Sequence, residues 1–321
     1  MILIINNEVT FLAESDLGFR YFLQNEKAVI VRCYSNSPCV VIPSFLGEIA
    51  VAEVAPYCFS EKEPHLSQTE ILQFGCDFSH AVCGNFVESV SFSNGLKKIG
   101  SHAFYNCRNL KNLHLPSSLQ SVEGDAFMNC HALQTLYFEG DVFQPSALRQ
   151  VAALIQHQIE AVFEDNNRFL FPEYYEELEE NTPAHIFNRQ MIGVGYRYRQ
   201  CFSANRLDIA EYDNTFLTAS AEESSKMLCH LALNRLLFPV SLSNAAKQQY
   251  QQYLSEHLST AFIVCVEQET IDALQYLLEQ FSPDFACRQA AHQLAQKNGF
   301  VAAAALLTQN KSQPIEKSYD F

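Results

Sequence analysis

Three residues of this chain come closest to a set of metal ligands. Cys76, His80 and Cys83 follow the spacing C-x3-H-x2-C, and thiolates and imidazoles are ligands that zinc prefers. A structural zinc site needs four ligands, and no fourth one is evident at a matching spacing. We therefore expect a packing role for these side chains, with zinc as the weaker alternative, and the sequence predicts no cofactor.

Motifs of catalysis are missing from the sequence. It contains no G-x4-G-K-[ST] phosphate loop, no G-x-S-x-G turn, no C-x-x-C pair and no H-E-x-x-H helix. The stretch GVGYRY (193–198) lacks the third glycine of a dinucleotide-binding turn. The paired glutamates of 173–180 have the composition for acid–base work, but a solvated charged face explains them better. The sequence thus predicts that the protein is not an enzyme.

Arginines and tyrosines gather in the middle of the chain, where they could hold phosphates or RNA. They are Arg189, Arg197, Arg199, Arg206, Tyr196 and Tyr198. A run of glutamates just before them offers a simpler partner, so pairing within the chain is the favoured interpretation. These glutamates are Glu173, Glu176, Glu177, Glu179 and Glu180.

The bulk composition narrows the class of partner and the compartment. A net charge of −15 on 321 residues, spread over both halves, disfavours nucleic acid and anionic membranes. Apolar runs such as AFIVCV are too short to span a membrane, and the N-terminus has no basic flank of a signal peptide. Eleven irregularly spaced cysteines then predict reduced thiols and a cytoplasmic location.

A 23-residue repeat organises the part of the chain before residue 140. Phe104 recurs as Phe127, and Cys107 recurs as Cys130 at the same step. Each copy contains an L-x-L stretch that alternates like a short strand with one buried face. A unit of this size buries its apolar side chains only when copies stack, so the repeat predicts a solenoid.

The repeat resembles the BspA-type leucine-rich repeat, in which L-P-x-x-L-x-x-I-g-x-x-A-F-x-x-C-x-x-L recurs at about this length. The segment LPSSLQSVEGDAFMNCHAL (115–133) matches that pattern nearly position by position, and a diverged copy lies at 39–59. The resemblance covers about 28–140. It implies an interaction scaffold, often a surface adhesin of bacteria or protists.

Two further expectations follow from the repeat. Phe59 precedes Phe104 by nearly two periods, which predicts a degenerate repeat within 64–86. Cys107 and Cys130 are expected to fill tight interior positions at successive turns, and not to act as metal ligands or redox thiols.

The outward-facing strand residues of the repeats are the candidate binding site. Strand alternation turns them away from the core, in parallel columns along the sheet. We expect them to contact a protein partner; the alternative is that they are ordinary solvated strand positions. The candidates are Ser89, Ser91, Asn112, His114, Thr135, Tyr137 and Glu139.

Helices and a mixed segment are predicted after the repeat. The pattern of 146–165 indicates one amphipathic helix, with Ser146 as N-cap, that covers the open end of the solenoid. An acidic helix is predicted over 171–183. The stretch 190–202 alternates like a strand, with 206–216 as its partner.

From about 218 the chain reads as helical. Helices are predicted over 218–239, 243–266, 269–281 and 283–310, the last with a turn at Asn298-Gly299. Residues 267–310 resemble degenerate ankyrin repeats, although the Thr-Pro-Leu-His opening is absent.

The prediction is an α+β protein: an N-terminal leucine-rich-repeat solenoid followed by a C-terminal all-helical, ankyrin-like domain. Its parts are 1–143 for the repeats, 144–216 for the capping helix and connecting segment, and 217–321 for the helical domain. The predicted function is a non-enzymatic, cytoplasmic scaffold of bacterial type that binds a protein through its repeat surfaces. Two alternatives stay open, a regulator with a small-molecule site between the two domains, near Arg197, Tyr198 and Arg199, and a structural subunit of an assembly.

Overall fold

The computed structural model describes residues 4–5, 8–9, 17–63, 70–75, 80–181 and 186–308. The chain forms two compact units, Met1–Asp208 and Ile209–Phe321. The sequence had predicted a separate connecting segment at 144–216, whereas the structure assigns most of that segment to the first unit. A short hairpin of β1 (Ile4–Ile5) and β2 (Glu8–Val9) precedes the main sheets.

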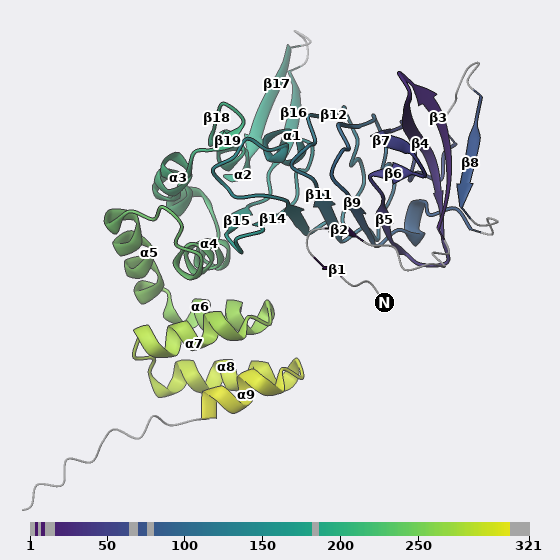
Figure 1. Cartoon of the computed structure of the whole chain (residues 1–321). Coiled ribbons are helices and arrows are strands. Elements are labelled where there is room, and N and C mark those ends of the chain that lie inside the picture. The colour runs from purple at the N-terminus through teal and green to yellow at the C-terminus, as the bar shows by residue number, and fades with distance from the viewer. Residues whose placement is uncertain are drawn as a thin grey trace, which may run out of the picture. The chain divides into compact units, whose positions relative to one another are not determined.

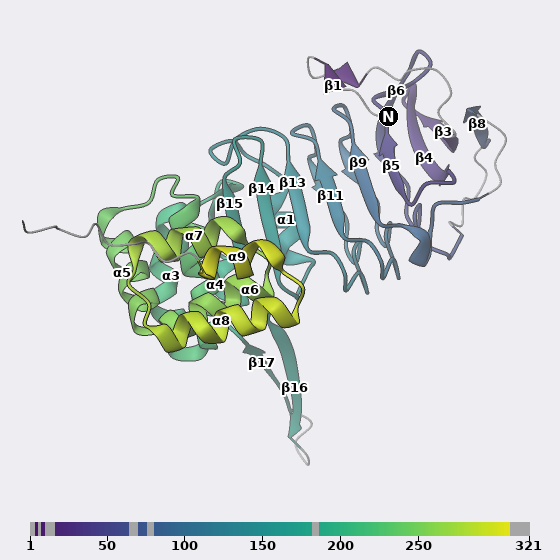
Figure 2. The same ribbon diagram turned by 90° about the horizontal axis from the view of Figure 1, so that it is seen from below.

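Two sheets run along the stack of turns in the N-terminal unit (Figures 1 and 2). The front sheet has the order β15-β14-β13-β11-β9-β5 and is parallel from β5 to β14, while β15 is antiparallel. Its strands are β5 (Cys39–Ile42), β9 (Ser89–Phe92), β11 (Asn112–Leu115), β13 (Thr135–Phe138), β14 (Ile159–Phe163) and β15 (Arg168–Phe171).

The back sheet has the order β12-β10-β7-β4-β3-β8, with β6 paired to β7. The antiparallel hairpin of β3 and β4 extends it toward the N-terminus, because β4 adds to β7 as a parallel neighbour. Its strands are β3 (Gly18–Gln24), β4 (Lys27–Tyr34), β6 (Phe45–Leu46), β7 (Ile49–Val54), β8 (Leu72–Gly75), β10 (Lys98–Ile99) and β12 (Ser121–Val122).

A column of phenylalanine rings fills the core where each turn crosses between the sheets. The ring of Phe104 stacks on that of Phe59, with centroids 4.7 Å apart, and on that of Phe127 at 5.6 Å. The thiols of Cys107 and Cys130 lie beside this column. Each donates a hydrogen bond to the carbonyl of the phenylalanine one turn earlier, at 3.1 and 3.0 Å. Both are buried, as predicted, and burial raises the pKa of the Cys130 thiol to about 12.

The predicted extra repeat within 64–86 was wrong. Phe59 stacks directly on Phe104, and β5 pairs directly with β9, so these are successive turns. The intervening residues leave the solenoid instead: β8 joins the edge of the back sheet by pairing with β3. A one-turn helix, η1 (Gly84–Phe86), then leads back into β9. Residues 64–69 and 76–79 lie outside the described part of the chain.

The single helix predicted over 146–165 was also wrong. Helix α1 (Leu148–Ala153) is only six residues long, and the segment after it forms β14, a further parallel strand of the front sheet. Ser146 is not the N-cap, although its hydroxyl accepts a hydrogen bond from the Leu148 amide. The ring of Phe163 stacks on Phe138 at 5.6 Å, so burial in the next turn overrides the helical periodicity.

Helix α1 does cover an open edge, as expected for this region. The Gln150 side chain accepts a hydrogen bond from the Val122 amide and donates one to the Gln120 carbonyl, at 2.9 and 3.0 Å. Its carboxamide thus pairs with the edge of β12 as another strand would. The back sheet therefore ends at β12, while the front sheet continues through β14 to β15.

The acidic segment predicted as a helix is a β-hairpin. Strand β16 (Tyr175–Asn181) pairs with β17 (Ile186–Ile192), and the two project from the solenoid (Figure 2). At its base, a Cβ on Gly195 would lie 2.1 Å from the Pro172 carbonyl oxygen, so only glycine permits this approach.

The strand predicted at 190–202 was wrong beyond Ile192, and 206–216 is not its partner. This region folds as α2 (Gly195–Tyr198), the short hairpin β18 (Phe202–Ser203) and β19 (Arg206–Leu207), and the start of α3.

The C-terminal unit is helical, as predicted, with boundaries that differ. The first helix begins at Ile209, before the predicted 218. The helix predicted over 218–239 is divided between this helix and the next, which has Ser224 as its N-cap, and the predicted helix 243–266 breaks at His257. Gly299 has the predicted left-handed conformation, with a φ of 73°. The helices are α3 (Ile209–Glu222), α4 (Ser225–Leu237), α5 (Asn244–Glu256), α6 (Leu258–Glu267), α7 (Ile271–Gln280), α8 (Phe285–Lys297) and α9 (Val301–Thr308).

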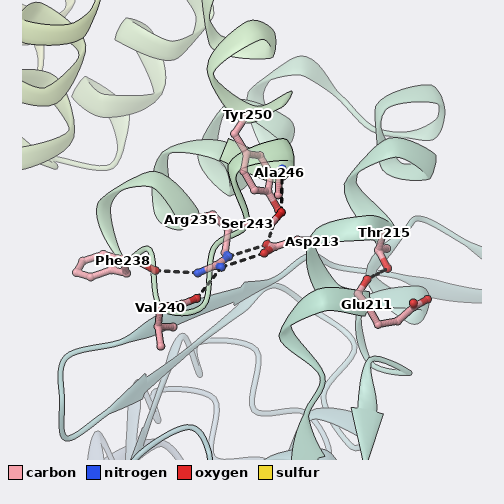
Figure 3. A network of polar contacts seen from close by, with 9 residues as sticks. All are labelled: Glu211, Asp213, Thr215, Arg235, Phe238, Val240, Ser243, Ala246 and Tyr250. Atoms are coloured by element: carbon pink, nitrogen blue, oxygen red, sulfur yellow. Dashed lines mark hydrogen bonds and ion pairs between the residues drawn. The ribbon is translucent and has the colours of Figure 1, made fainter. Parts of the chain in front are cut away.

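A buried ion pair joins the first three of these helices (Figure 3). The Arg235 guanidinium donates to both carboxylate oxygens of Asp213, at 2.7 and 3.0 Å, and the Tyr250 hydroxyl donates to the same carboxylate at 2.8 Å. Arg235 also donates to the carbonyls of Phe238 and Val240, which follow α4. One cation therefore fixes α3, α4, α5 and the loop between the last two.

Truncation of the central ring of the phenylalanine column tests what holds the solenoid together. Phe104→Ala should cost about 3–5 kcal/mol, because the lost ring leaves a cavity between two turns. Hydrogen–deuterium exchange of the β9, β11 and β13 amides measures this cost within the solenoid; exchange should speed up by roughly 10²-fold or more. Met128→Ala, at an exposed position of the neighbouring turn, serves as the control and should change exchange little.

Loss of one partner of the buried ion pair should destabilise the helical unit strongly. Asp213→Ala leaves the Arg235 charge buried without its carboxylate, so we expect a cost of about 3–5 kcal/mol in urea unfolding. Tyr250→Phe removes one hydrogen bond and should cost about 1 kcal/mol. The double replacement Asp213→Leu with Arg235→Met should restore much of the stability lost in Asp213→Ala. Equal effects of Asp213→Ala and Tyr250→Phe would contradict this account.

Candidate functional site

The outward residues of the front sheet form two columns in register, one residue per strand. Ser89, Asn112 and Thr135 lie side by side on neighbouring strands. Ser91, His114 and Tyr137 form the second column two residues further along each strand. The residues between the columns, Val90, Leu113 and Leu136, are completely buried. The predicted alternation is thus confirmed, and we refer to these six polar residues as the front face.

The His114 and Tyr137 rings are the anchor of the front face. They stack with centroids 4.3 Å apart and planes only 8° from parallel. Partial burial lowers the pKa of His114 below its usual value, since the desolvated imidazole is harder to charge. The imidazole is therefore mostly uncharged at neutral pH, and the stacked pair adds an aromatic element to the front face.

Glu139 holds the turns together at the end of strand β13. Its carboxylate accepts hydrogen bonds from the Ser117 amide and hydroxyl, at 3.0 and 3.2 Å, and from the Asn94 side-chain amide. Asn94 and Ser117 occupy equivalent positions of two successive turns and Glu139 lies in the next turn, so the contact links all three. Glu139 thus has a structural role beside the binding role predicted for it.

The columns extend beyond the predicted residues at both ends. Cys39 lies beside Ser89 on β5, and its side chain is exposed. Glu160 lies beside Thr135 on β14 and forms an ion pair with Arg168 at 3.6 Å. The sequence did not reveal this last strand because the step from Thr135 to Glu160 is 25 residues, and α1 interrupts the repeat.

A second feature that the sequence reasoning missed lies where the strands of the front sheet begin. Lys111 forms an ion pair with Glu88 of the preceding turn, at 3.1 Å, and both side chains are well exposed. The two residues are again one 23-residue step apart, which is the signal that could have revealed them. As a surface pair it contributes little to stability, but it holds the Lys111 ammonium in a defined position.

The arginine cluster is largely used within the fold. Arg189 pairs with Glu176 across the hairpin at 3.4 Å, as expected for pairing within the chain. The buried Arg199 guanidinium donates to five backbone carbonyls and lies over the Tyr174 ring at 4.9 Å. The carbonyls are those of Ala152, Ile155, His157, Pro172 and Gly195. Burial lowers the pKa of Arg199 to about 10, and its guanidinium is directed at these backbone carbonyls, so its contacts within the described chain are structural.

No metal site is formed by the residues that the structure describes, since their Cys, His, Asp and Glu side chains nowhere gather in threes around a common point. Cys76 lies outside those residues, and the half-buried Cys83 has a pKa that burial raises. Within the described ranges, no helix has the length and apolarity needed to cross a membrane.

The parallel front sheet, the shorter strands behind it and the stacked rings at each turn define the N-terminal unit as a leucine-rich-repeat solenoid. Residues 78–176 match the BspA type Leucine rich repeat region, in six copies, so the repeats of this segment are of that type. The match begins at 78, later than the predicted 28, and extends past the predicted limit of 140, where β14 and β15 continue the front sheet. The ankyrin-like character of 267–310 stays a prediction.

Two solved structures are similar over 40% of this chain. One is a leucine rich repeat protein of T. pallidum, 26% identical with a TM-score of 0.29, and the other is a leucine rich cell surface protein of Faecalibacterium prausnitzii A2-165, 20% identical with a TM-score of 0.27. The similar region spans 53% of the first chain and 32% of the second. No curated protein matches this sequence.

Burial of His114 in the stacked pair predicts a lowered imidazole pKa and a pH dependence of the solenoid's stability. The His114 imidazole should titrate below its ordinary value of about 6.5, measured from its ring-proton shift by NMR. Because the folded state binds this proton less readily than the unfolded state, the solenoid should lose a little stability as pH falls below about 6.5. Tyr137→Ala exposes the imidazole, so its pKa should rise toward the ordinary value. A midpoint at or above about 6.5 in the unmodified protein would contradict the role assigned to burial.

Proposed function

We propose that this protein binds another protein through the front face, without catalysis. The observation that carries the proposal is the register of the two polar columns: six outward side chains from three successive strands lie on one continuous surface. Leucine-rich repeats commonly serve as protein-interaction modules, which agrees with this role.

The chemistry of the front face defines the kind of contact it can make. Its six side chains are hydroxyls, one amide, one imidazole and one phenol, so they offer donors and acceptors without a fixed charge at neutral pH. The strands hold them rigidly, and the stacked pair of His114 and Tyr137 is already ordered. Binding therefore loses little side-chain entropy, which favours this pair as the energetic centre of the interface.

The proposed partner is a protein with a polar, weakly charged surface. A strongly acidic partner is disfavoured, because the net charge of −15 on this chain would repel it. We further propose a cytoplasmic location, because eleven irregularly spaced cysteines favour reduced thiols.

Removal of the ring pair tests the proposal. In the intact chain, His114→Ala with Tyr137→Ala should lower the affinity for the partner by at least about tenfold, since such central aromatic residues typically contribute 1–2 kcal/mol or more each. A control of the same residue types replaces His102 and Tyr105, which form an edge-to-face ring contact on the turns, with centroids 5.9 Å apart.

The measurement is quantitative affinity capture with mass spectrometry, followed by titration of each captured protein against the purified variants. The front-face variant should lose a partner that the control variant retains, while both keep the circular dichroism of the unmodified protein. Equal retention by the two variants, or loss only with the control, would refute a front-face interface.

A further inference from the structure

The last two helices of the described chain leave one side uncovered. Helix α8 buries Cys287, Ala291 and Ala295 and packs against α6 and α9. Helix α9 buries Ala303 and Leu307. The opposite sides of both helices face water, and they form one surface because the two helices pack side by side.

This surface carries the most exposed large apolar side chains of the described residues. Phe285 is 79% exposed and Val301 is 77% exposed. Helix α9 has the sequence VAAAALLT, with no polar residue before its last position, and a helix that is apolar on all sides is normally covered. We call the surface formed by Phe285, Ala286, Gln289, Gln293, Val301 and Ala305 the hairpin face.

The hairpin face also lacks the negative charge found elsewhere on this unit. Neither α8 nor α9 contains an Asp or Glu residue. Other helices of this unit expose several carboxylates, among them Glu211, Glu267, Asp272 and Glu279. Two copies of a chain with a net charge of −15 repel each other, and this repulsion is weaker where they meet at a surface without carboxylates.

We propose that the hairpin face is a self-association surface, on which a second copy of this chain docks about a two-fold axis. Charge at the rim supports that occupant. Asp284 precedes α8 and Lys297 ends it, so an antiparallel pair of α8 helices places Asp284 of each copy near Lys297 of the other. In this antiparallel arrangement the positive end of each helix dipole lies beside the negative end of the other, which is also favourable.

The size of the hairpin face sets the expected affinity of the two copies for each other. Helix α8 has 13 residues and is about 20 Å long, so the two helices offer a patch of modest area. Patches of this kind fall at the small end of specific interfaces, which corresponds to a dissociation constant in the micromolar range. The inference concerns the helical unit and is independent of the function proposed for the front face.

Sedimentation velocity of the full chain from roughly 1 to 100 µM tests the inference, since this range brackets a micromolar constant. The unmodified protein should shift from monomer to dimer. The double variant Phe285→Glu with Val301→Asp should weaken the dimer by at least about tenfold, because it places four carboxylates in the interface. Both positions are the first residue of their helix, where an acidic side chain favours the helix, so folding should be preserved.

Leu217→Glu is the matched control. Leu217 lies on α3, is 64% exposed and undergoes the same change from apolar to acidic, but it is outside the hairpin face. This variant should dimerise like the unmodified protein, and circular dichroism should confirm that all variants keep their helical content.

Three results would overturn the inference. They are a chain that stays monomeric throughout the range, a dimer that the double variant leaves intact, and a dimer that Leu217→Glu weakens equally. A variant ending at Thr308 tests one other occupant, namely residues 309–321 of the same chain. If this variant dimerises while the full chain does not, residues 309–321 occupy the hairpin face in the full chain, and a second copy does not.

Discussion

The column of phenylalanine rings sets the geometry on which the N-terminal unit depends. Ring stacking at 4.7 and 5.6 Å matches the spacing of neighbouring strands, about 4.8 Å, so a ring can be placed at every turn without opening the sheets. The cysteine thiols beside the rings add a second hydrogen bond to the Phe59 and Phe104 carbonyls, which also accept from a backbone amide. Each turn is therefore held by its neighbours more than by itself, as expected for a repeat protein. The outward columns of the front face are a consequence of that spacing.

Buried arginines donate hydrogen bonds to backbone carbonyls where helices and strands of this fold end. Arg32, at the N-terminal end of the solenoid, donates to the carbonyls of Cys58, Ser60 and Lys62. Arg199 does the same at the C-terminal end. In the helical unit Arg235 serves the carbonyls after α4 and, in addition, a carboxylate. A guanidinium has five donors in a planar fork, so one side chain can satisfy several orphan acceptors where a lysine would satisfy fewer.

The two units differ in how carboxylates are distributed over their surfaces. On the solenoid, lysines take up acidic neighbours of adjacent turns: Lys98 lies 2.6 Å from Glu123, and Lys111 lies 3.1 Å from Glu88. Each pair links two successive turns, and the six residues of the front face include no Asp, Glu, Lys or Arg. On the helical unit the carboxylates are instead excluded from α8 and α9. Neutral surfaces of both kinds are suited to association, because they avoid the repulsion that the rest of the chain would cause.

The sequence by itself determined the features that depend on local chemistry repeated at a fixed step. The 23-residue period predicted the strand register, the buried rings and the outward columns, because identical residues at equivalent turns meet the same neighbours. Serine and aspartate caps at Ser243 and Asp284, and the left-handed Gly299, likewise act within a few residues.

Only the tertiary structure decided where the chain departs from its own repeat. The apolar residues of 146–165 fit a helix and also a short helix followed by a strand, and stacking of Phe163 on Phe138 selected the latter. The glutamates of β16 favour a helix in isolation, but pairing with β17 overrides that preference. The insertion after Phe59 leaves the stack because β3 offers it an unpaired edge. In each case the deciding contact comes from a residue distant in the sequence, and local periodicity does not record such contacts.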